Sequence, residues 1–214
     1  MKKVVLIGDS IRMGYDKYIK DALSGTAEVF YPSENCRFAE YVLRYANTWK
    51  INGNWGDDVD LVHWNAGLWD VLELFGDEPL TSLSYYGEAI ARIDKRLRML
   101  FPNAKIVFAT STNVNEKMAK PEFMRHNVII EKYNAEALRV LSNTDTVIND
   151  LYSITESVPD SYRSDWVHFY TPEGTELIGG KVLSLICELL DITPEQINIE
   201  DFEPEKYSKS NIGG

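Results

Sequence analysis

Cysteine is scarce in this sequence, and long hydrophobic runs are absent. The two cysteines, Cys36 and Cys187, lie far apart among 214 residues and form no Cys-x-x-Cys pair. They indicate neither a disulfide scaffold nor a structural zinc site. No run of about 18 apolar residues predicts a membrane-spanning helix. The apolar run Val4–Ile7 is too short for the core of a signal peptide, so we expect a cytoplasmic protein.

Basic residues are also in the minority. The chain has 22 Lys and Arg against 33 Asp and Glu, a net charge of −11. Such a chain has no electrostatic footprint for nucleic acid or for an anionic membrane, and we expect neither as a partner. The glycine-rich motifs of nucleotide enzymes and the Gly-x-Ser-x-Gly elbow are missing as well. Hydrophobic residues make up 44% of the sequence, which favours one folded domain with a sizeable core.

Short apolar runs alternate with longer segments of helical periodicity. This alternation predicts an α/β fold with a parallel sheet. We assign residues 1–192 to one domain and residues 193–214 to an acidic and polar surface tail, with one helical turn near Glu195–Phe202. The expected strands are Lys3–Ile7, Ala27–Tyr31, Asp60–Trp64, Lys105–Thr110 and Thr146–Ile148. The expected helices are Met13–Leu23, Phe38–Trp49, Tyr85–Leu100, Glu122–Leu141 and a last one from Thr171-Pro172 to Leu190.

The tripeptide Gly8-Asp9-Ser10 lies directly after the first expected strand and before the first expected helix. Open α/β sheets place their binding crevice at the carboxyl ends of the strands, so we expect Ser10 at its mouth. A nearby helix N-terminus favours developing negative charge, and the N–H of Ser10 itself is suited to hold an oxyanion. A capping turn without catalytic function explains the tripeptide equally well when it is taken alone.

A second signal is the Asp-x-x-His stretch from Asp165 to His168, just before the last expected helix. This spacing lets Asp165 accept a hydrogen bond from Nδ1 of His168 and leaves Nε2 free to take a proton from a serine. The other histidines, His63 and His126, fall in an expected strand and an expected helix, and we expect neither to have a comparable carboxylate. By itself, the pair is more often structural than catalytic.

Taken together, the two signals resemble the SGNH (GDSL-type) hydrolases. In that family Gly-Asp-Ser is the first sequence block and Asp-x-x-His the last, and the similarity spans about residues 3–190. It implies a flavodoxin-like three-layer α/β/α sandwich around a five-stranded parallel sheet. It also implies a catalytic triad of Ser10, His168 and Asp165, with no metal and no organic cofactor.

The third block of the family, usually Gly-x-Asn-Asp, is altered here. Gly67 and Asp70 align with it, but Trp69 stands where the family has the asparagine whose side chain donates to the oxyanion. Some members carry Asn-x-Gly-Leu-x-Asp instead, so the resemblance implies that Asn65 supplies this donor. The alternative is that Asn65 merely ties down a loop.

The second block normally contributes a backbone N–H from a glycine after the second strand. No glycine stands in residues 32–39. We therefore expect the N–H of Arg37 or Phe38 to complete the oxyanion hole together with Ser10 and Asn65. For Arg37, a substrate contact or a surface ion pair with Glu34 is an open alternative.

The predicted function is hydrolysis of a short-chain ester, an acetyl ester in the first place, of a carbohydrate or other polar alcohol. Aromatic residues beside the motifs suit stacking on sugar rings, although tryptophans more often simply pack. A thioesterase or short-chain lipase of the same mechanism, a non-catalytic binding module with the same fold, and a homo-oligomer all stay open. The residues assigned to substrate binding are Asp9, Gly67, Trp69, Asp70 and Trp166.

Overall fold

Five parallel strands form the central sheet, in the order β2-β1-β3-β5-β7. The structure is a computed structural model that describes residues 1–199. All four neighbouring pairs of strands in this sheet are parallel. The predicted five-stranded parallel sheet is therefore confirmed, and every expected strand boundary lies within one residue of the observed one. The strands are β1 (Lys2–Ile7), β2 (Ala27–Phe30), β3 (Leu61–Trp64), β5 (Lys105–Ala109) and β7 (Val147–Asn149).

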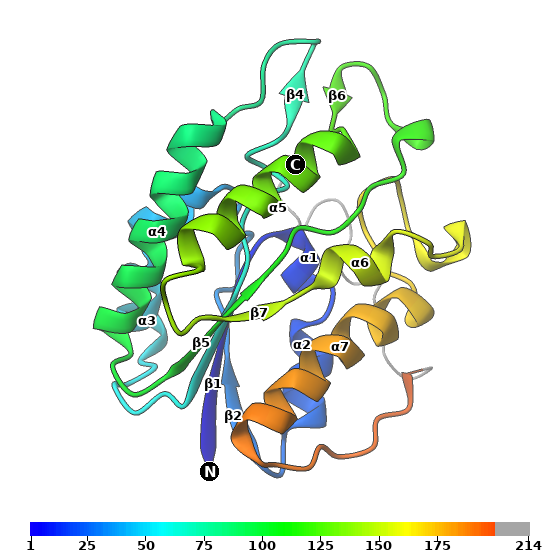
Figure 1. Cartoon of the computed structure of the whole chain (residues 1–214). Coiled ribbons are helices and arrows are strands. Elements are labelled where there is room, and N and C mark those ends of the chain that lie inside the picture. The colour runs from blue at the N-terminus through cyan, green and yellow to red at the C-terminus, as the bar shows by residue number, and fades with distance from the viewer. Residues whose placement is uncertain (200–214) are drawn as a thin grey trace.

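Helices cover both faces of this sheet, which makes the predicted three-layer α/β/α sandwich (Figure 1). On one face α3 (Ala39–Gly53) packs beside α4 (Leu83–Leu100), and α4 packs beside α5 (Asn127–Leu141). On the other face α2 (Asp16–Ala22) packs against α7 (Pro172–Leu190).

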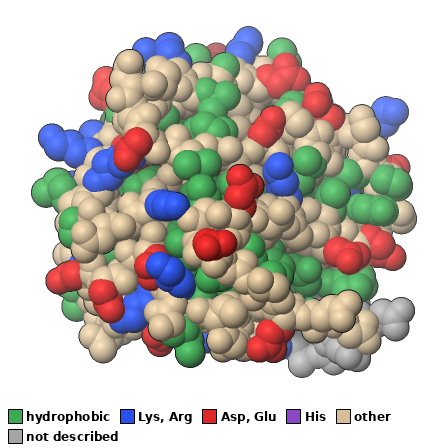
Figure 2. Space-filling view, turned by 60° about the horizontal axis from the view of Figure 1, so that its bottom comes forward, with side chains coloured by type: hydrophobic (Ala, Val, Ile, Leu, Met, Phe, Trp, Pro, Cys, Tyr) green, Lys and Arg blue, Asp and Glu red, His purple; other side chains and the backbone are tan. Residues whose placement is uncertain are grey.

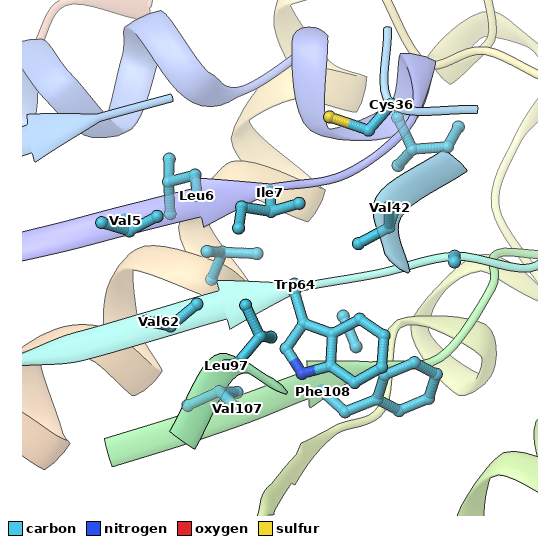
Figure 3. Packing of buried hydrophobic residues seen from close by; sticks show 14 of the residues in the cluster. Val5, Leu6, Ile7, Cys36, Val42, Val62, Trp64, Leu97, Val107 and Phe108 are labelled. Carbon is cyan, nitrogen blue, oxygen red and sulfur yellow. The ribbon is translucent and has the colours of Figure 1, made fainter. Parts of the chain in front are cut away.

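The core explains why the first strand is a continuous apolar run. Val5, Leu6 and Ile7 are fully buried, because helices lie on both sides of the strand (Figure 3). On the neighbouring strands Trp64 and Phe108 pack edge to face, with 4.8 Å between their ring centroids. Strands buried on both faces lose the alternation of polar and apolar residues that an exposed sheet would show.

Two expected helices were wrong in part. The segment Met13–Leu23 is not one helix: a single turn, α1 (Ser10–Met13), ends at Gly14, and α2 begins at Asp16. The helix expected from Glu122 begins only at Asn127. The reason is that β6 (Phe123–Met124) pairs antiparallel with β4 (Glu73–Leu74) in a small second sheet that local periodicity does not reveal. The remaining short elements are α6 (Leu151–Thr155), η1 (Glu116–Met118) and η2 (Asp160–Tyr162).

The first residues of the expected tail lie against the domain. The backbone N–H of Glu195 donates to the carbonyl of Ala22 at 2.8 Å, and Ile197 packs against the core. Residues 195–198 are not helical, and the rest of the turn expected near Glu195–Phe202 lies mostly outside the described residues.

Charged side chains of both signs are interspersed on the face that Figure 2 presents. Within residues 1–199, none of the helices has the length and the apolar composition needed to cross a membrane.

Candidate active site

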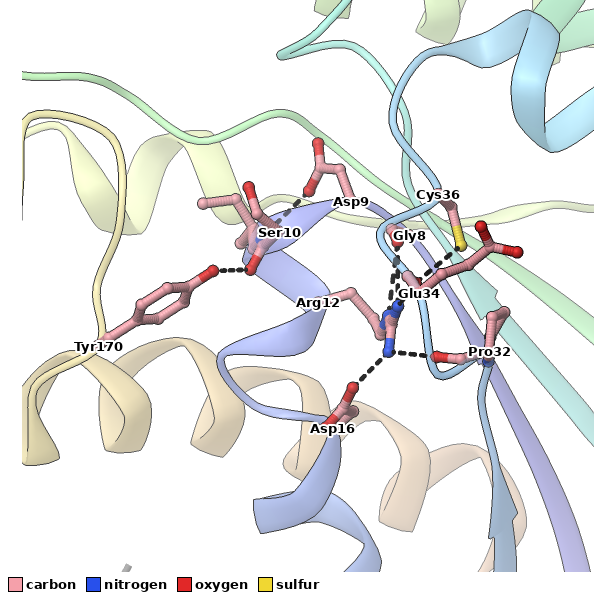
Figure 4. A network of polar contacts seen from close by, with 10 residues as sticks. Gly8, Asp9, Ser10, Arg12, Asp16, Pro32, Glu34, Cys36 and Tyr170 are labelled. Atoms are coloured by element: carbon pink, nitrogen blue, oxygen red, sulfur yellow. Dashed lines mark hydrogen bonds and ion pairs between the residues drawn. The ribbon is translucent and has the colours of Figure 1, made fainter. Parts of the chain in front are cut away.

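The carboxyl end of β1 carries Ser10 as the first residue of α1. Asp9 caps this helix, because its Oδ1 accepts a hydrogen bond from the N–H of Ile11 at 3.0 Å. The strand thus ends in a tight turn that leads directly into a helix, and Ser10 is the first residue of that helix (Figure 4). Backbone N–H groups at such a position are unpaired within the helix and favour negative charge.

Ser10, His168 and Asp165 form one chain of hydrogen-bonding contacts. Ser10 Oγ lies 2.8 Å from Nε2 of His168, and Nδ1 of His168 lies 2.7 Å from Oδ2 of Asp165. The other carboxylate oxygen, Oδ1, accepts the backbone N–H groups of Val167 and His168, both at 2.8 Å. With Nδ1–H donating to Asp165, Nε2 is the acceptor that faces the serine hydroxyl. This geometry suits a nucleophile, its base and the group that orients the base.

The environment of Asp165 keeps this carboxyl ionised. Burial, the largest single effect, would raise its pKa, but the hydrogen bonds and charge of His168 and the N–H of Val167 outweigh it. Together they lower the pKa of Asp165 to about 2. A carboxylate in this state holds the imidazole in one tautomer and stabilises the imidazolium.

Two backbone donors lie unused at the expected oxyanion hole. Among residues 1–199, the N–H groups of Ser10 and Phe38 donate to no acceptor. The N–H of Arg37, by contrast, donates to Oδ1 of Asn35 at 2.9 Å. Of the two donors expected after the second strand, Phe38 is therefore the one available for a substrate.

Arg37 has a backbone conformation that is uncommon for residues other than glycine. Its φ is +50°, in the left-handed region that glycine favours. The Asn35 side chain stabilises this turn by accepting the Arg37 N–H. The guanidinium lies over the ring of Tyr41, 5.2 Å from its centroid, and makes no ion pair with Glu34 among the residues described.

Asn65 follows β3, and its side chain lies against Gly8, in the turn that precedes Ser10. Its N–H donates to Ile7 O at 3.0 Å, and the residue is 4% exposed. A Cβ on Gly8 would lie 1.9 Å from Asn65 Oδ1, so the glycine of Gly-Asp-Ser makes room for this amide. Hydrogen bonding from Asn65 also opposes the effect of burial, which raises the pKa of Asp9.

Two of the residues assigned to substrate binding bind the protein backbone instead. Asp9 and Asp70 are fully buried, so neither offers its carboxylate to a substrate. Both oxygens of Asp70 accept the N–H of Ala39, at 3.2 and 3.1 Å, at the start of α3. Burial raises the pKa of Asp70 to about 7, although the hydrogen bonds from Thr81 and Ala39 lower it in part. Asp70 therefore holds the N-terminus of α3, and with it Phe38, whereas Asp9 caps α1.

The remaining residues that we expected to bind the substrate differ in their exposure to solvent. Gly67 is buried with φ of +150°, and a Cβ there would lie 2.2 Å from Ser111 Oγ, so glycine is needed for the close packing of two loops. Trp69 and Trp166 are half-buried and keep part of their surface for a ligand. Trp64, which also flanks the motifs, lies wholly in the core.

The other candidate bases and nucleophiles are placed elsewhere. His63 is fully buried, accepts Nδ2–H of Asn149 at 3.1 Å, and has its pKa lowered to about 3 by burial. His126 does have carboxylate partners, against expectation: Nδ1 lies 3.1 Å from Glu116, and Nε2 lies 3.6 Å from Glu73. Burial raises the pKa of the Cys36 thiol to about 11, which disfavours a nucleophilic thiolate.

Arg12 is a buried residue that contributes to the structure of this site, and no sequence motif indicated it. Its guanidinium pairs with Asp16 and donates to Pro32 O at 3.0 Å and to Glu34 O at 2.6 Å (Figure 4). It thereby fastens the loop after β2 to the helix that carries Ser10. The spacing of Arg12 and Asp16 is that of an ordinary surface pair on a helix, so only the fold reveals its burial.

Tyr170 and Arg125 are also close to the triad. Tyr170 stacks on His168, and its hydroxyl donates to the carbonyl of Ser10. Arg125 donates through Nε to the carbonyl of Leu68. No sequence motif pointed to either residue. Within residues 1–199, no group of three or more His, Cys, Asp or Glu side chains is arranged to hold a metal ion.

Comparison with solved structures identifies the fold. A lipase/acylhydrolase from Enterococcus faecalis superposes with a TM-score of 0.68 at 19% identity, covering 92% of this chain and 100% of that one. A GDSL-like lipase from Bacteroides thetaiotaomicron gives 0.65 at 18% identity, with 87% and 88% covered. A catalytic mutant of an acetylxylan esterase from Geobacillus stearothermophilus gives 0.64 at 15% identity, with 86% and 94% covered. No family model matches the sequence, and no curated protein matches it either.

Proposed function

We propose that this chain, whose fold is that of the SGNH hydrolases, is a serine esterase for short-chain esters, acetyl esters in the first place, of a carbohydrate or other polar alcohol. The observation that carries the proposal is the continuous contact from Ser10 through His168 to Asp165, at 2.8 and 2.7 Å. Acyl transfer needs these three roles in this order.

In the first step Ser10 Oγ attacks the ester carbonyl while Nε2 of His168 takes its proton. The carbonyl oxygen becomes an oxyanion, for which the N–H groups of Ser10 and Phe38 and the side chain of Asn65 are the available donors. His168 then gives the proton to the departing alcohol, and an acyl-enzyme remains on Ser10. The Asp165 carboxylate stabilises the imidazolium throughout this step.

In the second step water attacks the acyl-enzyme, with His168 again as the base. The oxyanion forms in the same place and collapses to release the carboxylic acid and free Ser10. Each step moves one proton between the oxygen nucleophile, Nε2 and the leaving oxygen, so no electron acceptor or metal is needed to balance the reaction.

Two observations favour a short acyl group on a polar alcohol. Trp69 and Trp166 are half-buried, and Trp166 follows Asp165 directly in the chain. Partly exposed aromatic side chains of this kind can stack on sugar rings. Acetylxylan esterases are among the proteins that share this fold. A thioesterase or a lipase of the same mechanism would differ in its preference for leaving group or chain length.

The test is hydrolysis of p-nitrophenyl acetate, butyrate and octanoate by the wild-type protein and by Ser10→Ala. Loss of a serine nucleophile has cost about 10⁶ in turnover in a serine protease, so the variant should be close to blank. Ser142→Ala, which removes an exposed hydroxyl at the end of α5, is the matched control and should keep full activity.

The dependence of activity on acyl-chain length and the chemical labelling of Ser10 complete this test. We expect activity to fall from acetate to octanoate, and a fluorophosphonate probe to label the wild-type protein but not Ser10→Ala. A wild-type protein that is inert on all three esters and unlabelled would overturn the proposal in favour of a non-catalytic binding module. A preference for octanoate would indicate a lipase, and a preference for acetyl thioesters would indicate a thioesterase.

A further inference from the structure

Arg125 is a buried cation at the edge of the proposed active site. It follows β6, and the residue is only 8% exposed. Nε donates to the carbonyl of Leu68, in the loop after β3, and the guanidinium lies over the ring of Trp166, 5.3 Å from its centroid. Arg125 therefore bridges the loop that follows Asn65 and the loop that carries Asp165 and His168.

No acidic side chain among residues 1–199 forms an ion pair with Arg125. Its charge interacts with those of Asp9 and Asp165, but neither carboxylate lies within ion-pair distance of the guanidinium, and Oδ2 of Asp9 has no hydrogen-bond partner among the residues described. Asp165 binds His168, and Asp9 caps α1. Burial lowers the pKa of Arg125 to about 10, so the group is still a cation at neutral pH.

The terminal amino groups of Arg125 have spare donor capacity. Within residues 1–199 neither of them donates a hydrogen bond, and neither is completely shut off from solvent. The face of the guanidinium is fixed by Trp166 and its Nε by Leu68 O. The edge that carries the two amino groups is therefore held in place by these two contacts, and it makes no hydrogen bond to any of residues 1–199.

Arg12 shows what a satisfied buried arginine looks like in the same chain. It has Asp16 as a counter-ion and donates to the carbonyls of Pro32 and Glu34. A buried charge without such partners is strongly unfavourable, and charged side chains are seldom fully buried unless they are paired. The difference between the two arginines points to a partner of Arg125 that is not part of the chain.

We propose that Arg125 binds an anionic group of the substrate, a carboxylate in the first place, and that the group belongs to the alcohol part of the ester. This inference rests on the proposed esterase function and narrows its substrate class to acyl esters of acidic sugars or other hydroxy acids. The free edge of a guanidinium matches the two oxygens of a carboxylate in a bidentate contact. A short acyl group has no room for an anion, so the anion lies on the alcohol side. The net charge of −11 does not attract anions, which leaves recognition to this local cation.

A matched pair of substrates tests the proposal. 4-Acetoxybenzoate carries a carboxylate on the leaving alcohol, whereas methyl 4-acetoxybenzoate is neutral and similar in shape. The variants are Arg125→Gln, which removes the charge, and Arg125→Lys, which keeps the charge but cannot make the bidentate contact of a guanidinium. Arg139→Gln, on the exposed face of α5, is the control for a change in overall charge.

We expect the wild-type protein to have the higher kcat/KM on the anionic ester. Charged hydrogen bonds of this kind correspond to about a 10- to 100-fold effect, so Arg125→Gln should lose that much on the anionic ester, chiefly through KM. On the neutral ester it should change by less than about threefold on the same basis. Arg125→Lys should recover part of the preference, and Arg139→Gln should retain all of it.

Three outcomes would overturn the inference. In the first, the wild-type protein itself shows no preference for the anionic ester, a result that does not depend on whether any variant folds. In the second, Arg125→Gln loses activity equally on both esters, which would make Arg125 a positioning or oxyanion residue. In the third, the wild-type protein is inert on both esters and Ser10 is not labelled by fluorophosphonate, in which case the proposed function itself has failed. Labelling of Ser10 together with hydrolysis of the neutral ester separates the first two outcomes from the third.

Discussion

The phenol ring of Tyr170 stacks on the imidazole of His168, with 4.8 Å between the ring centroids and 24° between the ring planes. The hydroxyl of the same tyrosine donates to the carbonyl of Ser10. This carbonyl is free to accept because α1 is only one turn long, and the N–H of Gly14 donates to Ile11 O instead. A Cβ on Gly14 would lie 2.6 Å from the tyrosine ring, so the glycine makes this packing possible. One side chain therefore fixes the distance between the proposed base and the proposed nucleophile.

The first prediction concerns this tyrosine as a positioning residue. Tyr170→Phe keeps the stacked ring and loses one hydrogen bond, so kcat should fall about fivefold with little change in KM. Tyr170→Leu loses both contacts and should lower kcat further and change the pH profile of kcat. Steady-state kinetics between pH 5 and pH 9 would measure both effects.

Tyr133→Phe is the matched control for Tyr170→Phe. It also removes a buried hydroxyl that donates to a backbone carbonyl, that of Thr81, but it lies on α5. We expect a similar loss of stability and an unchanged kcat. If Tyr170→Leu had the kcat and pH profile of the wild-type protein, the positioning role would be wrong.

Asp165→Asn should preserve the fold and remove most of the activity. The amide oxygen can still accept the N–H groups of Val167 and His168, but the amide can no longer hold His168 in the productive tautomer. In a serine protease the corresponding change costs about 10⁴ in kcat, and we expect a loss of similar size here. Asp150→Asn, at the N-cap of α6, is the control and should leave kcat unchanged. A loss no larger in Asp165→Asn than in Asp150→Asn would contradict the assignment.

Asn65→Ala distinguishes an oxyanion donor from a residue that only ties down a loop. Removal of one side-chain donor from an oxyanion hole costs about 10² to 10³ in kcat. The comparison is Asn149→Ala, which removes another buried asparagine at the end of a strand, bonded to His63. We expect Asn149→Ala to lower only the unfolding free energy, and Asn65→Ala to lower kcat as well. Equal kcat in both variants would leave Asn65 with the structural role alone.

Much of the fold could be predicted because its signals are local. The buried run Val4–Ile7 and the Thr171-Pro172 helix start each identify an element without help from the rest of the chain. The residues of the site came from two short motifs, Gly8-Asp9-Ser10 and the stretch that ends at His168. Their proximity was suggested only by the resemblance to a family, since 158 positions separate Ser10 from His168.

The features that escaped prediction depend on contacts between distant segments. The start of α5 at Asn127 is set by the pairing of β6 with β4, and this pairing also places Arg125. Asp9 and Asp70 stand in the motifs that resemble those of the SGNH hydrolases, but their carboxylates accept backbone N–H groups at the starts of α1 and α3, a distinction that requires knowing where α3 begins. A sequence motif identifies the residue type at a site, and the packing decides whether its side chain faces a substrate or the backbone.

Arg37→Gly should stabilise the protein without affecting catalysis. A left-handed conformation costs a non-glycine residue about 1 kcal/mol, and glycine removes this cost, less the contact between Arg37 and Tyr41. Urea unfolding should show a gain of up to about 1 kcal/mol, and kcat/KM on p-nitrophenyl acetate should be unchanged. A marked rise in KM would instead support the alternative that Arg37 contacts the substrate.

The buried carboxyl of Asp70 should make stability fall as pH rises through neutrality. Its pKa in the folded protein is raised from 3.8 to about 7, chiefly by burial. Between these values the folded state binds the proton and the unfolded state does not. The contribution to stability is therefore complete below about pH 4 and is lost as pH rises towards and past 7. The full difference corresponds to a free energy on the order of 4 kcal/mol.

Asp70→Asn isolates this effect, because asparagine can still accept the N–H of Ala39 and never ionises. The unfolding free energies of the two proteins should be measured in urea at several pH values between 5 and 8. They should diverge, because that of the wild-type protein falls as pH rises. Asp150→Asn is the comparison, since the pKa of Asp150 is lowered and its carboxyl is ionised throughout this range. Its difference from the wild-type protein should be constant. A constant difference for Asp70→Asn as well would mean that Asp70 is already ionised at pH 5, with enough hydrogen bonding at the start of α3 to offset its burial.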